Sequence, residues 1–430
     1  MILKSFRKYI YPILILILAV YCIKEALENG DFKVFLEAAK LIRNGENPYN
    51  EWIFVSEGNY CLYFYSPLWA VLLIPFSYFP NFIPNIIWLL ANIFFLYQIY
   101  QLLKRFVDLN AITRKQLSWI LLLCIIMSLR FILYNFGMIQ MTIFLLWGVL
   151  ESLRLIQGKK IVYGGILLAL IINIKILPIV ILPYLLYRNY IKGFVCTLIF
   201  SVVFLFLPIL YTGWSTNNFL LTEWWSAINP VNPEHLIETE LGPHSLTALV
   251  PTLLTETSGK ISIQRNIFNL NENTVIYALN IIRFLLIILT LFFLKWPPFT
   301  HARNKLFQLR ELSYITLLIP LIFPHQQKYA FILTIPTLFY LSHFVIINHR
   351  LRRVVMRSLR WYTLMTIIFL SFIFMTLSTD GVIGRELNNI SQHFKTITWG
   401  ALFLIFALLL ANPKITLKTK ELQLTKPKLH

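Results

Sequence analysis

Charged residues are scarce in this chain, and their scarcity excludes a soluble enzyme or a disordered scaffold. Asp, Glu, Lys and Arg make up 13% of the 430 residues, whereas hydrophobic residues make up 58%. Soluble domains carry about 25% charged residues, so this composition cannot cover a globule with polar surface. Runs such as 275–294 are almost continuously apolar, whereas the strands of a membrane β-barrel alternate. The sequence therefore predicts an all-α polytopic membrane protein.

Acidic residues are fewer than basic ones, 19 against 38, and the formal net charge is +19. In membrane proteins, Lys and Arg collect in cytoplasmic loops. Most acids lie outside the basic segments, so the excess of positive charge indicates topology and not nucleic-acid binding. Both termini are expected in the cytoplasm. Most basic residues fall in seven segments that we assign to that side: the N-terminus, 104–117, 152–160, 188–193, 295–311, 347–360 and the tail from 413.

Paired cysteines and metal-binding motifs are also lacking. Three of the four cysteines fall in apolar stretches and only Cys61 lies in an expected outer loop, so a disulfide framework is not predicted. The chain has no P-loop, no Gly-rich dinucleotide loop and no HExxH helix. We expect no metal site and no required cofactor, while the use of a divalent metal stays open.

About twelve apolar segments are candidates for transmembrane helices, because about 20 residues are needed to cross about 30 Å of hydrocarbon. They form one integral membrane domain, 1–430, with outer loops at 24–81, 214–274 and 380–395 and a cytoplasmic tail at 413–430. The first segment has the length and flanks of a signal peptide but lacks a small-residue cleavage site, so we interpret it as a retained signal-anchor helix. The candidates are 9–27, 82–103, 118–134, 141–156, 161–174, 176–187, 194–213, 275–294, 312–323, 329–348, 361–379 and 396–412.

Two segments decide whether the basic loops fall on one side. Residues 67–79 are apolar but short and rich in proline, so we expect a helix on the outer face. Residues 161–187 form either one long helix or a hairpin of two short ones broken around Lys175 and Pro178. Only the hairpin keeps both flanking basic segments in the cytoplasm. A broken helix is tolerated at membrane depth where it lines a wet cavity or is buried in protein.

Asp31 begins a segment, 31–44, whose apolar residues recur at helical spacing and predict an interfacial amphipathic helix. One interpretation of Asp31 is a helix N-cap, because its carboxylate can accept a hydrogen bond from a free backbone amide. The other is a general base that takes a proton from an acceptor hydroxyl. The first interpretation does not exclude the second.

Other ionisable residues lie near the outer ends of apolar helices, where their placement is costly and points to function. Lys175 is a cation at the expected helix break, or a lysine that extends to the interface. His325 and Lys328 lie in a polar break after Pro324, which suits a phosphate; a lone His is otherwise most often structural. The full set is Asp31, Glu37, Lys175, His244, His325 and Lys328.

Several short motifs, in this order, resemble the multi-spanning glycosyltransferases of the GT-C class, most closely glycosyltransferase family 87 (the DUF2029 group). The resemblance extends over about residues 10–345. It implies a GT-C-like fold with outer amphipathic and juxtamembrane helices. The motifs are Asp31-Phe32, Gly45-Glu46-Asn47-Pro48-Tyr49, Tyr65-Ser66-Pro67, Asn135-Phe136-Gly137, Lys175-Ile176-Leu177-Pro178, Gly242-Pro243-His244-Ser245 and Pro324-His325.

The resemblance implies an inverting transferase that moves mannose or another sugar from a polyprenyl-phosphate donor to a glycan or glycolipid acceptor. Asp31 would be the catalytic base, and Lys175, His325 and Lys328 would bind the donor phosphate. The site would face the non-cytoplasmic side, with the bacterial inner membrane as the expected location. Candidate substrate-binding residues are Glu37, Tyr49, Tyr65, Gln140, His244 and Ser245.

The rival interpretation is a transporter or flippase for lipid-linked sugars, and a third is a polysaccharide polymerase. Transporters often show repeat symmetry between their halves. No repeat stands out in this sequence, which favours the enzyme.

Overall fold

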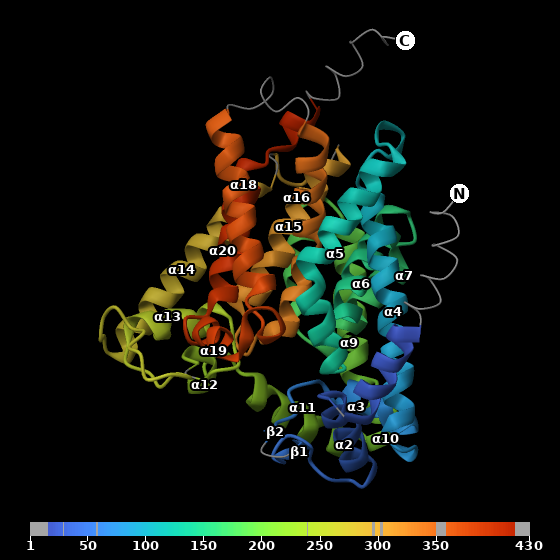
Figure 1. Cartoon of the computed structure of the whole chain (residues 1–430). Helices are drawn as coiled ribbons and strands as arrows, with labels where there is room; N and C mark the ends of the chain where they lie inside the picture. Colours follow the sequence, from blue (N-terminus) through green and yellow to red (C-terminus); the bar gives the residue numbers. More distant parts are fainter. Residues whose placement is uncertain are drawn as a thin grey trace.

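The computed structural model describes residues 16–28, 30–56, 59–238, 240–294, 297–301, 304–349 and 358–417. Long helices run side by side between two ends of the molecule, and short elements gather at one of these ends (Figure 1). The predicted first span, 9–27, is described only from residue 16, where a helix continues to residue 28. Of the predicted tail, 413–417 is helical and 418–430 lies outside the described residues.

The elements follow one another in chain order. Up to residue 187 they are α2 (Phe32–Arg43), β1 (Ile53–Ser56), β2 (Asn59–Cys61), α3 (Pro67–Leu73), η1 (Ile74–Tyr78), α4 (Phe82–Lys104), η2 (Leu109–Ala111), α5 (Arg114–Gly137), α6 (Thr142–Gln157), α7 (Ile161–Ile174), η3 (Leu177–Val180) and α8 (Ile181–Tyr187). The remainder are α9 (Ile191–Phe206), α10 (Ile209–Thr212), α11 (Trp214–Ile228), α12 (Pro233–Leu236), α13 (Leu246–Leu254), α14 (Glu272–Phe293), α15 (Lys305–Ile322), η4 (Lys328–Thr334), α16 (Ile335–Asn348), α18 (Ser358–Phe372), η5 (Ile373–Leu377), α19 (Asp380–His393) and α20 (Thr396–Leu410).

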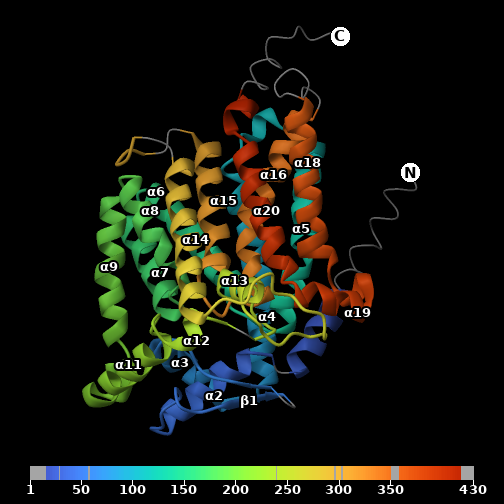
Figure 2. The same cartoon turned by 90° about the vertical axis from the view of Figure 1, so that its left-hand side faces the viewer.

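Short elements from the predicted outer segments share one end of the bundle. Figures 1 and 2 both place α2, α3, β1 and α11 at the lower end, while the turn between α4 and α5 lies at the upper end. That turn carries the basic 104–117 segment. Acid-rich outer segments and a basic loop therefore lie at opposite ends, as the charge pattern predicts.

The expected count of about twelve crossings is not confirmed. Among the described residues, six helices are long and apolar enough to cross a membrane, or seven if the bent pair α19–α20 is one span. Several predicted spans are short helices: α6 has 16 residues, α7 has 14 and α8 has 7. A 14-residue helix rises only about 21 Å, less than the hydrocarbon thickness.

The predicted break in 161–187 is present, and it forms a hairpin. Helix α7 ends at Ile174, and Lys175 has an extended backbone (φ −144°, ψ 125°). A Cβ added to Gly164 at the start of α7, or to Gly193 at the start of α9, would lie within 3 Å of the same side chain, Ile156. Both basic segments that flank the hairpin therefore lie at the same end, as the charge rule requires.

The outer segments hold more regular structure than predicted. Residues 67–78 form the short helices α3 and η1, which pack on α2; their place on the outer face stays a prediction. The expected outer loops 214–274 and 380–395 contain helices, which are α11, α12, α13 and α19. These helices were not predicted, because helix propensity in a short polar segment is weak evidence.

A small β-hairpin is the other departure from the all-α prediction. Strands β1 and β2 pair antiparallel, with Ile53 opposite Cys61 and Phe54 opposite Tyr60. The rings of Phe54 and Tyr60 lie 5.4 Å apart, and such cross-strand aromatic pairs stabilise a short sheet. The hairpin packs against α2.

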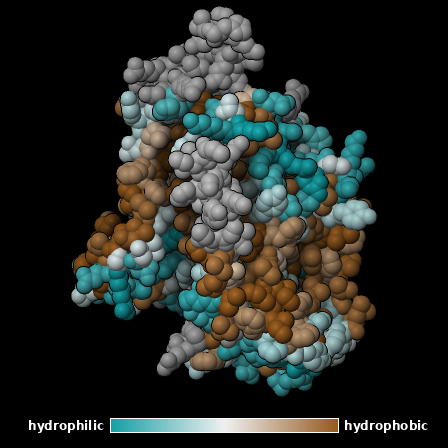
Figure 3. Space-filling view, turned by 45° about the vertical axis from the view of Figure 1, so that its right-hand side comes forward, coloured by the Kyte–Doolittle hydropathy of each residue, from teal (hydrophilic) through white to brown (hydrophobic). Residues whose placement is uncertain are grey.

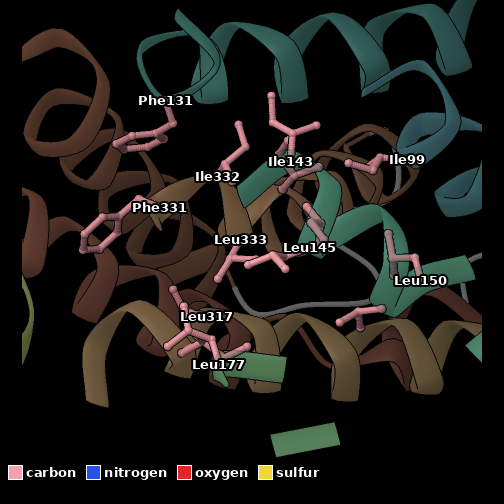
Figure 4. Packing of buried hydrophobic residues seen from close by; sticks show 14 of the residues in the cluster. Ile99, Phe131, Ile143, Leu145, Leu150, Leu177, Leu317, Phe331, Ile332 and Leu333 are labelled. Carbon is pink, nitrogen blue, oxygen red and sulfur yellow. The ribbon is translucent and has the colours of Figure 1, made fainter. Parts of the chain in front are cut away.

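The core lies between the helices of the bundle. Buried side chains from α5, α6, α15 and η4 meet there, among them Phe131, Leu145, Leu317 and Phe331 (Figure 4). The molecular surface has large apolar areas too: on the face in Figure 3, hydrophobic residues lie at both sides and in the lower centre, with hydrophilic residues toward the top and bottom. This pattern fits a protein whose middle is in contact with lipid.

One ion pair is buried at the end of the bundle opposite α2. The guanidinium of Arg188, just after α8, donates to both carboxylate oxygens of Glu311 on α15, and its Nε–Oε2 distance is 2.9 Å. The Tyr184 hydroxyl donates to the same carboxylate at 3.3 Å. Both charged side chains are almost fully buried, so the pair fixes the end of the α7–α8 hairpin against α15.

Candidate active site

Asp31 does not use its carboxylate to cap α2. It occupies the N-cap position with helical backbone angles (φ −57°, ψ −16°), but its side chain accepts no hydrogen bond from the helix. The cap interpretation is therefore wrong, and the carboxylate points away from its own helix. Helix α2 buries Phe32, Phe35 and Leu36 among others, so its apolar face contacts protein where the sequence predicted an interface with lipid.

Gly30 brings Asp31 against the turn between α5 and α6. The Asp31 backbone N–H donates to the Met138 carbonyl at 2.9 Å. A Cβ on Gly30 would lie 2.5 Å from the Met138 carbonyl carbon, closer than two non-bonded carbons approach. Any other residue would push the backbones apart, so this contact requires glycine.

The Asp31 carboxylate meets two groups from distant parts of the chain. The Gln140 side-chain amide donates a short hydrogen bond to Asp31 Oδ2. Burial raises the pKa of Asp31 above its usual value, while the Gln140 hydrogen bond and the positive charge of Lys175 partly oppose that rise. A carboxylate with a raised pKa is a stronger base than an exposed one.

Lys175, at the helix break, points toward the Asp31 side of the molecule. Its ammonium donates to the Tyr65 hydroxyl at 3.2 Å and lies 5.1 Å from the centre of that ring. It also lies 5.4 Å from the ring centre of Tyr329. The snorkelling interpretation is therefore wrong, because the side chain is held among protein groups. Burial and the nearby Asp31 raise the pKa of Tyr65 well above its usual value, so its phenol stays neutral.

Lys328 lies beside this group. Its ammonium is 5.4 Å from the ring centre of Tyr134, and the rings of Tyr134 and Tyr329 stack with their centres 6.5 Å apart. Tyr329 thus contacts Lys175 on one side and the aromatic partner of Lys328 on the other. Two cations and a carboxylate line one region, although they come from α7, η4 and the start of α2.

His325 forms a second group with residues of the 214–274 segment. Its backbone has φ 55°, an uncommon left-handed conformation for a non-glycine residue. The Nδ1 atom lies 2.9 Å from Glu238 Oε1, and Nε2 lies 2.7 Å from His235 Nδ1. The His325 ring is about a third exposed, whereas the Glu238 side chain is 2% exposed.

Consecutive residues join the two groups. The ring of Phe64 stacks on the ring of His325, with centres 5.7 Å apart, while the Tyr65 hydroxyl holds Lys175. Neighbouring Cα atoms are about 3.8 Å apart. His325 and Lys175 therefore border the same short stretch of backbone, between β2 and α3.

His244 and Ser245 lie next to the second group. The Ser245 hydroxyl donates to Glu238 Oε2 at 2.7 Å, and the His244 backbone N–H donates to the Gln326 carbonyl at 2.8 Å. The His244 ring is fully buried, and among the described residues neither of its nitrogens has a hydrogen-bond partner. Burial and the nearby positive charge of Lys395 lower the pKa of His244 well below its usual value, so the ring is neutral.

The structure separates two of the predicted substrate-binding residues from these groups. Glu37 pairs with Lys40 one helical turn further along α2, at 2.7 Å. Tyr49 is buried and its hydroxyl donates to the Tyr65 backbone carbonyl at 2.9 Å, so it supports the backbone that carries Tyr65. Their roles in binding stay predictions, but neither side chain shows a contact with Asp31, Lys175 or His325.

Several residues of the site were not predicted from the sequence. His235 and Glu238 lie three residues apart in a polar segment, and this spacing is typical of residues on one face of a helix. It does not indicate that Glu238 contacts His325, which is 87 residues away. Phe64, Tyr134 and Tyr329 look like ordinary membrane aromatics in the sequence. Among the described residues, no group of three or more His, Cys, Asp or Glu side chains is arranged to hold a metal ion; the expectation about metals stays a prediction.

Comparison with known proteins gives one match. The sequence profile of glycosyltransferase family 87 matches residues 63–324. No curated protein and no solved structure matches the chain significantly. The matched range contains Tyr65, Gln140, Lys175 and Glu238, while Asp31 precedes it and His325 follows it directly.

Proposed function

The chain belongs to glycosyltransferase family 87, and from this we propose that it transfers a sugar, mannose or a related one, from polyprenyl phosphate to a glycan or glycolipid hydroxyl. It is a glycosyltransferase with several helices able to cross a membrane. One observation supports the proposal above the others: the Asp31 carboxylate is turned away from its own helix and faces Gln140 and the Lys175 cation. A general base next to a cation suits this reaction, because the acceptor hydroxyl must lose a proton and the leaving phosphate gains negative charge.

In the proposed reaction, Asp31 takes the proton of the acceptor hydroxyl. The acceptor oxygen then forms a bond to the anomeric carbon. The bond between that carbon and the phosphate oxygen breaks, and its electron pair leaves with polyprenyl phosphate. Attack on the face opposite the leaving group inverts the anomeric configuration, and Asp31 ends protonated.

Lys175 and Lys328 supply the positive charge for the leaving phosphate. Fixed cations placed where negative charge develops lower the barrier without reorganisation. Tyr65 accepts a hydrogen bond from Lys175, so its own hydroxyl proton is available for a substrate oxygen. His244 is a further candidate for substrate binding, because buried ring nitrogens without partners favour a ligand or water.

His325 is the third residue proposed for the donor phosphate. Both its ring nitrogens have partners in the protein, so a direct N–H contact with phosphate would replace one of them. In its protonated form His325 acts without such a contact, because its charge reaches over a few ångströms in a medium of low dielectric constant.

The reaction is tested in detergent solution, with purified protein, polyprenyl-phosphate mannose and a membrane extract that contains acceptors. We expect a mannosylated product by mass spectrometry, with the configuration at its anomeric carbon inverted by NMR. A transporter would show no transfer without a membrane barrier and would move the sugar only in vesicles. Absence of transfer from a panel of lipid-phosphate sugars would contradict the proposal.

We also propose that the site faces the non-cytoplasmic side, as the loop charges predict. In a variant without native cysteines, Ser262→Cys in the exposed outer segment is expected to react with an impermeant maleimide on intact cells. Asp108→Cys at the basic end is expected to react only after permeabilisation. The reverse labelling pattern would contradict this orientation.

A further inference from the structure

Two hydrogen bonds and one ion pair connect four groups in a row beside the site. His235 Nε2 lies 3.0 Å from the Ala227 carbonyl oxygen, and His235 Nδ1 lies 2.7 Å from His325 Nε2. The third link runs from His325 Nδ1 to Glu238 Oε1, at 2.9 Å. All three distances are in the range of normal or strong hydrogen bonds, so each link contains one proton.

Both ends of this row accept hydrogen bonds and do not donate them. The Ala227 carbonyl has no proton, and an ionised carboxylate has none. The three protons must therefore come from the two imidazoles. Two neutral imidazoles carry only one N–H each, which provides two. The geometry requires one proton more than His235 and His325 carry in their neutral forms.

The extra proton belongs to the imidazoles and not to Glu238. The backbone N–H of His325 donates to Glu238 Oε1 at 2.5 Å, and the Ser245 hydroxyl donates to Oε2 at 2.7 Å. Donors of this kind favour the ionised form of a carboxylate. Glu238 is thus an anion, and the His235–His325 pair carries a single positive charge.

We propose that Glu238 and His235 hold His325 as an imidazolium, which is a fixed cation for the departing phosphate. This inference rests on the proposed function, since it names the charge state of a residue in that site. His325 is about a third exposed, and it borders Phe64, next to the residue that holds Lys175. Glu238 and His235 are positioning residues, because they act through His325.

Among the described side chains around the row, Glu240 is a second acid, whose charge interacts with that of Lys395, and the other charged groups are cationic. Arg283 of α14 and Lys395, before α20, are close enough for their charges to interact with that of Glu238, and Lys328 lies three residues after His325. The neighbouring His244 is neutral. In the described part of the chain, Glu238, in direct contact with His325, is the acidic group placed to hold a proton on it.

The decisive variant is Glu238→Gln, which keeps the shape of the side chain. The amide oxygen can still accept from the His325 backbone N–H, but the side chain is neutral, so the row loses the negative charge that holds its extra proton. Glu256→Gln, an exposed position in the same outer segment, is the matched control. His325→Gln identifies the signal of the residue itself.

The first measurement is ¹⁵N NMR of the full-length protein labelled at histidine, in lipid at pH 7.5. We expect one imidazolium signal that is present in the wild-type protein and the Glu256→Gln variant, and absent from Glu238→Gln and His325→Gln. Only neutral imidazoles in the wild-type protein, or an unchanged imidazolium in Glu238→Gln, would overturn the inference. This readout needs no turnover, so a failed sugar-transfer assay would affect the proposed function alone.

The second measurement is the pH profile of transfer from polyprenyl-phosphate mannose. At pH 7.5 we expect Glu238→Gln to lower kcat at least tenfold, with the acceptor KM unchanged. Lowering the pH should restore part of the lost rate, because protons from solution then charge the histidine pair. A variant with wild-type kcat, or a loss equal at every pH, would show that the row is only structural.

Discussion

The Asp31 carboxylate accepts a hydrogen bond from the Gln140 side chain, although 109 residues separate them in the chain. The bond links the first outer segment to the turn between α5 and α6. It also keeps the carboxylate off its own helix, where a capping bond would otherwise hold it.

Asp31→Asn is expected to lower kcat by about 10²–10⁴-fold, the usual contribution of a general base. The amide cannot take the acceptor proton, but it fills the same space, so expression and membrane insertion should be unchanged. Steady-state transfer by purified protein measures the effect. Asp108→Asn, at the opposite end of the bundle, is the matched control. Near-normal turnover of Asp31→Asn would remove Asp31 from the mechanism.

Gln140→Leu is expected to shift the pH dependence of kcat/KM. The pKa of Asp31 is raised by burial, and the Gln140 hydrogen bond opposes that rise. Removing the bond therefore raises the pKa further, and the base becomes protonated at a higher pH. The acidic limb of the profile should move to higher pH in Gln140→Leu and stay in place in Gln101→Leu. A shift to lower pH would contradict the electrostatic account.

Gly30→Ala is expected to reduce transfer without altering any catalytic group. The added methyl would meet the Met138 backbone at 2.5 Å, so Asp31 must move away from Gln140. A misplacement of about 1 Å can cost about 10²-fold in rate. Gly381→Ala is the control, because a Cβ there meets nothing within 4 Å. Equal activity of the two variants would show that the turn yields without affecting the site.

Lys175→Met is expected to lower kcat by about 10²–10³-fold, which is the usual loss when one group that stabilises transition-state charge is removed. The variant keeps the length of the side chain. Lys115→Met, in the basic loop at the other end, should leave the rate unchanged. If Lys175→Met raised only the acceptor KM, the cation would serve the acceptor and not the leaving group.

Arg188→Met tests the buried ion pair that fixes the α7–α8 hairpin. Removing one partner of such a pair costs about 3–5 kcal/mol, because the other charge stays buried. We expect a clear drop in the thermal midpoint of the detergent-solubilised protein, read by fluorescence-detected gel filtration. The double variant Arg188→Met/Glu311→Leu should recover much of the loss. A double variant no more stable than the single one would contradict this explanation.

Much of the fold could be predicted, because lipid imposes strong rules on composition. Apolar runs indicated helices, and the positions of Lys and Arg indicated which loops share a side. The break at Lys175 followed from the same charge rule. The number of crossings could not be predicted as well, because a 14-residue apolar helix such as α7 resembles a short span until its partners are known.

The site was predicted in part. Asp31, Lys175 and Lys328 were singled out because ionisable groups next to apolar helices are costly. Gln140 entered through the resemblance to a family. Their arrangement depends on contacts between distant segments, such as Gly30 with Met138 and His325 with Glu238, which leave no periodic signal in a single sequence. The N-cap interpretation of Asp31 failed for the same reason, since a distant donor competes with the local one.

The contact of Gly30 with Met138 has a consequence for biogenesis. The carboxylate enters the membrane system early, with the first helix, but its partners at 138, 140 and 175 are synthesised much later. Until those segments are synthesised, Asp31 lacks both the Gln140 hydrogen bond and the nearby charge of Lys175. The proposed site can therefore form only after the segments that carry these partners have been made and have packed against the first outer segment.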